Sequence, residues 1–116
     1  NKQDEYFQRL EEGIRSYRDG DWESAIISLE HALDSEPEDS YCLRELSKLY
    51  LKSKNYEKAI PLAEKYIKLN PHDTDFLLYL AFAHKQRRNF ELACDFSERL
   101  RLRDPRNFKN LMLLCE

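Results

Sequence analysis

Glycine and proline are scarce in this sequence, which argues against a β-rich fold. The chain contains two glycines and four prolines among 116 residues, whereas hairpin-rich proteins need such residues at many of their turns. With only Gly13 and Gly20 present, no glycine-rich phosphate loop exists. Leu, Ala, Glu, Lys and Arg dominate instead, which favours helices. The length suits one compact domain.

Cysteine and long apolar runs are also scarce. The cysteines, Cys42, Cys94 and Cys115, are odd in number and include no close pair. They therefore argue against a disulfide framework and suit a reducing compartment, so we expect a cytoplasmic protein. No apolar run approaches the ~18 residues of a membrane span, and no signal peptide is visible. The sequence opens on Asn1 rather than Met, which leaves room for an upstream segment.

Residue patterns for catalysis or metal binding are missing. None of His31, His72 and His84 lies three to five residues from a cysteine or another histidine, so no zinc pattern exists. No Ser/His/Asp set can be picked out, and the carboxylates are spread along the chain. We therefore expect no enzyme, no catalytic or metal site and no cofactor. Buried packing is the expected role of His84 and of the thiols.

Charge is unevenly distributed. Residues 1–40 carry 4 basic and 12 acidic side chains, whereas residues 85–109 carry 8 basic and 4 acidic ones. One explanation of this uneven charge is that the charged residues cover solvated helix faces. The alternative is that the two ends of the molecule associate end to end or bind separate partners. The net charge of −3 argues against nucleic acid as a partner, although a basic cluster lies near the C-terminus. Its members are Arg87, Arg88, Arg99, Arg101, Arg103 and Arg106.

A period of 34 residues runs through the sequence, and six columns in one register make coincidence a poor explanation. The columns are Trp22, Tyr56 and Phe90; Ala25, Ala59 and Ala93; Pro37, Pro71 and Pro105; Glu23, Glu57 and Glu91; Asp21, Asn55 and Asn89; and Asp39, Asp73 and Asn107. The Asp and Asn columns are suited to capping helices, and the glutamates favour the positive end of a helix. The prolines stop helices, and the alanines let a neighbouring helix approach.

The columns predict seven helices. Their expected ranges are about 3–18, 22–35, 40–53, 56–69, 74–87, 90–103 and 108–116. Because the connections are short, neighbouring helices must be antiparallel. Three helix pairs and one extra helix therefore stack into a short solenoid.

This unit, with a small residue at position 8, an aromatic at 17, Ala at 20 and Pro at 32, resembles the tetratricopeptide repeat. The resemblance places repeat 1 at 6–39, repeat 2 at 40–73, repeat 3 at 74–107, and a capping or fourth-repeat helix at 108–116. It implies an all-α fold, a right-handed superhelix of about seven antiparallel helices, in a single domain spanning 1–116. Repeat 1 departs from the family pattern at Arg9, Glu12 and Ser16, so the direction in which its first helix faces stays open.

In this family the first helix of each pair lines a concave groove that holds a partner's peptide or helix. The corresponding residues here are Phe7, Leu10, Ile14, Tyr17, Tyr41, Arg44, Lys48, Lys52, Leu78, Phe82 and Lys85. The same mapping includes Arg18, Leu51, Asp75, Gln86, Lys109 and Met112. Ordinary packing and solvation are the competing explanations for these side chains.

The expected function is a scaffold or adaptor that binds a partner protein in this groove. An apolar start and a stripe of Arg44, Lys48 and Lys52 predict a partner with apolar anchors and acidic residues. A dedicated chaperone for a secreted or assembling client is the alternative. The apolar segment 108–116 has three possible roles: a capping helix with its apolar face covered, a dimer contact, or the start of a longer repeat array. We favour the last.

Family members that hold the acidic tails of heat-shock chaperones clamp the terminal carboxylate with Lys and Asn. The resemblance argues against that clamp here, because no cation occupies its positions. Those positions hold Leu10, Ile14, Glu45, Asp75 and Tyr79. A register one repeat later gives a partial clamp that requires a complete fourth repeat. It would consist of Arg44, Lys48, Tyr79, Lys109 and Leu113.

Overall fold

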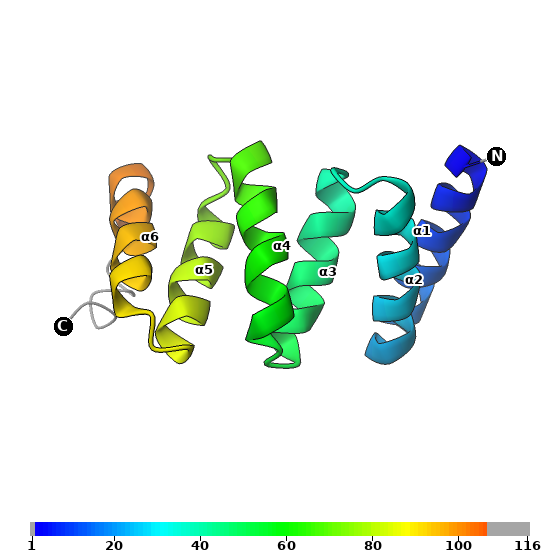
Figure 1. Ribbon diagram of the computed structural model, residues 1–116, viewed down its shortest axis with the longest axis horizontal. Helices are drawn as coiled ribbons and strands as arrows, with labels where there is room; N and C mark the ends of the chain where they lie inside the picture. The colour runs from blue at the N-terminus through cyan, green and yellow to red at the C-terminus, as the bar shows by residue number, and fades with distance from the viewer. Residues whose placement is uncertain (1, 107–116) are drawn as a thin grey trace.

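The computed structural model describes residues 2–106 of the chain, and this part folds into six α-helices (Figure 1). They are α1 (Lys2–Arg18), α2 (Trp22–Ser35), α3 (Ser40–Lys52), α4 (Tyr56–Leu69), α5 (Thr74–Gln86) and α6 (Phe90–Arg103). The six predicted ranges that fall here are confirmed to within one residue at each end. The seventh predicted helix, 108–116, lies outside the described residues.

The helices follow one another in chain order along the molecule, each antiparallel to the next, and α2 lies in front of α1 in the view of Figure 1. The array measures 49 × 24 × 22 Å. Packing is closest within the pairs α1/α2, α3/α4 and α5/α6, and successive pairs meet mainly through α2/α3 and α4/α5. Packing of each helix pair against the next is the architecture of a solenoid.

Side-chain caps begin four of the helices, as the Asp and Asn columns predict. Asp21, Asn55 and Asp73 accept hydrogen bonds from the backbone three residues onward, and Asp39 accepts one from the Cys42 amide at 2.9 Å. The prediction is wrong for Asn89, whose side chain makes no cap bond with α6. Its amide nitrogen instead lies 3.5 Å from Nδ1 of the buried His84, which draws the side chain away from the helix start.

The turn inside each helix pair passes through the left-handed region of backbone conformation. Gly20, Lys54 and Arg88, spaced by 34 residues, have φ values of 80°, 61° and 62°. In each turn the next amide reaches back to the preceding helix, as in the bond of 2.8 Å from the Asn55 nitrogen to the Tyr50 oxygen. Helices commonly end in this way, and glycine is the residue that adopts it without strain.

Small residues hold the helices of each pair close together. Ala25, Ala59 and Ala93 are fully buried, which confirms the role predicted for the alanine column. A Cβ atom on Gly13 would meet Leu29 Cγ at 2.9 Å, so glycine is required by the approach of α1 to α2. The core forms two clusters, one around Leu46 and one around Phe76, with Leu33 and Leu62 touching both.

Candidate functional site

The face formed by α1, α3 and α5, which we call the groove face, contains a first hollow between α1 and α3. It has a volume of about 280 Å³. Its lining residues are Gly13, Ile14, Tyr17, Arg18, Leu29, Tyr41, Glu45 and Leu49. Burial and the nearby Glu45 carboxylate raise the pKa of Tyr41, so its phenol stays protonated and can donate a hydrogen bond to a ligand. This hollow combines an apolar base with polar groups.

A second hollow follows on the same face between α3 and α5. It has a volume of about 420 Å³. Its lining residues are Lys48, Leu51, Lys52, Tyr56, Leu78, Tyr79 and Phe82. Tyr56 and Phe82 meet edge to face with their ring centroids 6.5 Å apart. Carbon surfaces with two ammonium groups suit a large apolar side chain beside an acidic one.

Lys52 lies between the two hollows. Its ammonium donates to the Tyr17 hydroxyl at 2.5 Å and lies 4.9 Å from the centre of the Tyr17 ring and 5.4 Å from that of Trp22. At Tyr17 the ammonium lies at the hydroxyl edge of the ring, where the hydrogen bond is the main attraction, whereas the Trp22 ring can attract it through its π electrons. These contacts connect α3 to both α1 and α2 through side chains far apart in the sequence.

All eleven residues predicted for the groove lie on α1, α3 and α5, and none is fully buried. Seven of them line the hollows: Ile14, Tyr17 and Tyr41 the first, and Lys48, Lys52, Leu78 and Phe82 the second. Phe7, Leu10, Arg44 and Lys85 line neither. Leu10 packs partly against the N-terminal core, whereas Phe7 is 53% exposed.

Six lining residues lie outside the predicted groove set: the buried Gly13, Leu29 and Leu49, and the partly exposed Glu45, Tyr56 and Tyr79. Tyr56 belongs to the aromatic column that suggests packing alone, yet it is only half-buried and forms part of the second hollow. The family pattern gives Tyr79 and Glu45 as clamp positions only. Glu45 lies 3.5 Å from Lys48 and so offsets one charge of the predicted basic stripe. Its spacing of three residues before Lys48 on one helix is the signal that could have identified the pair.

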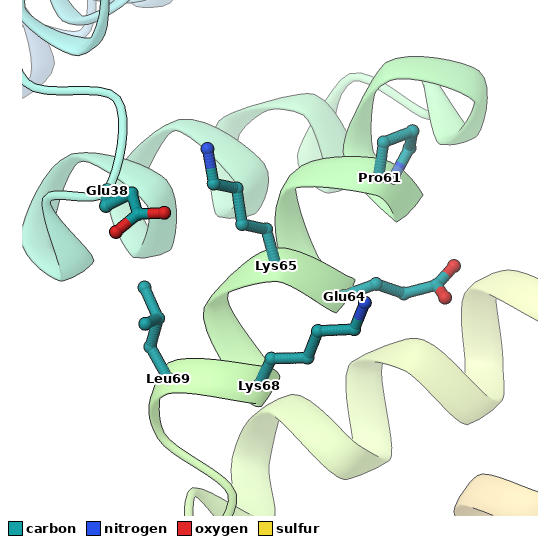
Figure 2. A pocket seen from close by; sticks show the side chains of 6 residues that line it. All are labelled: Glu38, Pro61, Glu64, Lys65, Lys68 and Leu69. Carbon is teal, nitrogen blue, oxygen red and sulfur yellow. The ribbon is translucent and has the colours of Figure 1, made fainter.

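A further hollow lies away from the groove face and is drawn in Figure 2. It is lined by Glu38, Pro61, Glu64, Lys65, Lys68 and Leu69, mostly from α4, and has a volume of about 610 Å³. Lys65 extends toward Glu38, whereas Glu64 and Lys68 extend toward the neighbouring helix (Figure 2). Two cations and two carboxylates balance one another here, so this hollow lacks the charge preference that the second hollow has.

The histidines occupy structural positions. His84 is 3% exposed and stacks on Phe96 with ring centroids 5.6 Å apart, which confirms the prediction of buried packing. His31 is exposed, and His72 lies exposed beside Arg103. Within residues 2–106, no three His, Cys, Asp or Glu side chains gather closely enough to hold a metal ion. None of the helices in this range is long and apolar enough to cross a membrane.

The two cysteines of the described region differ in environment. Cys42 is fully buried, as predicted, and burial followed by the Asp39 charge raises the pKa of its thiol to about 12. Cys94 is only half-buried, so the prediction holds in part. Ile26 and Ile60 at the equivalent positions are half-buried too, which shows that partial exposure is a property of this place in the pair.

Iodoacetamide at pH 8 should therefore label Cys94 in the native protein while leaving Cys42 largely unmodified. Only the thiolate reacts with iodoacetamide. Because the thiol pKa of Cys42 is raised in the folded protein, Cys42 should be labelled at least about 100-fold more slowly there than in urea-unfolded protein. Mass spectrometry of peptides after timed quenching measures both rates. Equal rates at the two cysteines in the native protein would contradict the burial of Cys42.

The sequence and fold match known proteins. Tetratricopeptide repeat models match residues 10–74 and 51–114. The crystal structure of MamA superposes with a TM-score of 0.80 at 20% identity, over 87% of this chain and 55% of that one, so the chain spans about half its length. The N-terminal domain of STI-1 from C. elegans gives 0.81 at 17% identity, covering 100% of this chain and 98% of that one.

A third structure, the TPR2B domain of yeast Sti1 in complex with pHsp70, gives a TM-score of 0.77 at 18% identity over 96% of this chain and 95% of that one. No curated protein matches the sequence significantly. At these identities the structures establish the fold.

A row of antiparallel helix pairs, each touching only its neighbours, defines a helical-repeat solenoid. The chain belongs to the tetratricopeptide repeat family, since each family model covers more than half of it. The expected all-α superhelical solenoid is thereby confirmed. Proteins of this family are interaction modules that generally lack catalytic activity.

Proposed function

We propose that this chain is a scaffold that binds a segment of a partner protein along the face of α1, α3 and α5. The observation that carries the proposal is the succession of two hollows on this face. Phe82 and Tyr17, 46% and 41% exposed, belong to their linings. Large side chains half-open to solvent in consecutive hollows suit apolar anchors of a bound segment.

The charge around the second hollow supports an acidic partner. Lys48 and Lys52 line it, and Arg44 and Lys85 lie on the same two helices, α3 and α5. Glu45 is the carboxylate paired with Lys48. A positive surface attracts acidic segments and speeds their association at low salt. The partner segment that we propose therefore combines apolar anchors with acidic residues.

Binding of a heat-shock tail through a carboxylate clamp is not the mechanism that we propose. The structure with pHsp70 concerns yeast Sti1, and the present chain has acidic Glu45 and Asp75 at two of the clamp positions. A negative side chain there repels a terminal carboxylate. Of the later, partial clamp, Arg44, Lys48 and Tyr79 lie on α3 and α5, while Lys109 and Leu113 lie outside the described residues.

Affinity capture from the native lysate tests the proposal with two matched variants. Leu78→Asp/Phe82→Asp places two charges in the second hollow, and Ile27→Asp places one on a residue that is 57% exposed and lines neither hollow. We expect the double variant to recover about tenfold less of the principal partner, because apolar anchors dominate such interfaces. Ile27→Asp should recover as much as the wild type. Quantitative mass spectrometry measures recovery, and equal loss in both variants would contradict the proposal.

The alternative, a dedicated chaperone, makes a different prediction for the captured partner. A client that aggregates alone but stays in solution as a stoichiometric complex with this chain would select it. A partner that is soluble and folded without the chain would select the adaptor function.

A further inference from the structure

Lys52 differs from the other cations of the groove face in the way its charge is held. The Tyr17 hydroxyl accepts one of its three N–H donors at 2.5 Å, and the rings of Tyr17 and Trp22 lie beside it. The ammonium therefore has a defined position while two donors stay available. A long lysine chain usually loses entropy when it binds, and these contacts reduce that loss.

The charge of Lys52 is also not neutralised by a carboxylate. Within residues 2–106, no Asp or Glu oxygen lies within ion-pair distance of its ammonium, whereas Lys48 one turn earlier lies 3.5 Å from Glu45. An incoming carboxylate at Lys48 competes with Glu45, but at Lys52 it meets a positioned cation beside two aromatic rings. Hydrogen bonds between an ammonium and a carboxylate are stronger than those between neutral groups.

The place of Lys52 between the hollows sets the order in which apolar and acidic residues must follow one another along a bound segment. Its side chain lines the second hollow and hydrogen-bonds Tyr17, which lines the first. A segment that occupies both hollows must pass Lys52 on the way. A carboxylate at the crossing then meets the ammonium while apolar side chains on either side enter the hollows.

We propose that the bound segment carries an acidic residue between two large apolar residues, and that Lys52 is the residue that selects this carboxylate. The inference rests on the proposed function, since it assumes a segment running along the groove face. It goes further in assigning the acidic contact to one lysine and in setting the order apolar, acidic, apolar. Lys58 serves as the control, because its ammonium also lies beside a tyrosine ring, that of Tyr50, but on α4 and outside both hollows.

A library of random peptides displayed on phage tests the order directly. The probes are the wild-type chain, Lys52→Gln and the control variant Lys58→Gln, which changes a lysine outside both hollows. We expect the wild type and Lys58→Gln to enrich peptides with Asp or Glu between two large apolar residues. Lys52→Gln should keep the apolar preference and lose the acidic one. No enrichment, a motif without the central acid, or the same motif with Lys52→Gln would overturn the inference.

A binding assay with the best enriched peptide measures the contact itself. The peptide is synthesised without Trp, with its central acid and with the corresponding amide. Trp22 is the only tryptophan of the chain and lies 5.4 Å from the Lys52 ammonium, so its fluorescence reports binding at the crossing. We expect the amide to bind the wild type about tenfold more weakly and to bind Lys52→Gln within about twofold of the acid.

This design separates the two proposals. Equal binding of acid and amide to the wild type overturns the role of Lys52, and it does so with an unaltered protein, so misfolding of a variant is not an explanation. Lys52→Met, which keeps most of the aliphatic stem, should reproduce Lys52→Gln in the same assay. Lysate capture with the Leu78→Asp/Phe82→Asp variant tests the proposed function separately. Its contradicting result is equal loss of the partner in that variant and in Ile27→Asp, which differs from equal binding of acid and amide.

Discussion

Phe76→Ala should lower the free energy of unfolding by about 3–5 kcal/mol, the range for removing a fully buried aromatic side chain. Phe76 is 1% exposed and belongs to the core cluster that joins α4, α5 and α6. Its ring centroid lies 4.4 Å from that of Tyr66 and 5.2 Å from that of Tyr79. The cavity would therefore remove contacts between the second and third helix pairs at once.

Urea unfolding followed by circular dichroism at 222 nm measures this loss. Phe82→Ala is the matched control, because Phe82 lies on the same helix but is 46% exposed. Its expected cost is about 1 kcal/mol or less, as for surface substitutions that leave no cavity. A similar loss in both variants would contradict the placement of Phe76 in the core. An early separate transition in Phe76→Ala would show that the C-terminal pair unfolds first, as the packing of each helix pair against the next permits.

Asp39→Ala should destabilise the chain by about 2–4 kcal/mol because one carboxylate has two roles. It caps α3 through the Cys42 amide at 2.9 Å and accepts the Tyr6 hydroxyl at 2.7 Å. Tyr6 is 7% exposed, and burial together with the hydrogen bond to Asp39 raises the pKa of its phenol. Removing the carboxylate leaves this hydroxyl buried without its acceptor, which costs more than the cap alone.

A double-mutant cycle with Tyr6→Phe separates the two roles. Since Tyr6→Phe removes the hydroxyl, adding Asp39→Ala to it should cost only about 1 kcal/mol, the value of a cap. Asp21→Ala is a second comparison, because Asp21 caps α2 at an exposed site. Additive effects of Tyr6→Phe and Asp39→Ala in urea unfolding would show that the hydroxyl and the carboxylate do not stabilise each other.

Most of the fold could be predicted from the 34-residue period, because the residues that repeat are those that begin, end and separate helices. Asp39 and Asp73 cap their helices, and Ala59 is buried, as their columns indicate. Asn89 is the exception. Its column predicts a cap, but the residue five positions earlier is His84, and a contact between side chains decided the outcome. A column describes backbone roles and carries no information about such competition.

The candidate site was predictable only in outline. Family positions place the predicted groove residues on α1, α3 and α5, but they do not show which side chains gather into hollows. Lys52 lies 35 residues after Tyr17 and 30 residues after Trp22 in the sequence, yet it contacts both. Such contacts depend on how one helix pair is set against the next. Tyr56 shows the same limit, since its column indicates packing and its ring also borders a hollow.

The left-handed turns have a consequence for how this protein can diversify. Gly20 adopts its φ of 80° freely, whereas Lys54 and Arg88 hold about 60° with a side chain attached. Each non-glycine residue there costs roughly 1 kcal/mol in native-state strain. Substitutions between glycine and other residues at these exposed positions can therefore raise or lower the thermal stability of a single helix pair. Because these turn residues line neither hollow, mutations there can change the stability of the protein without changing the residues of the groove face.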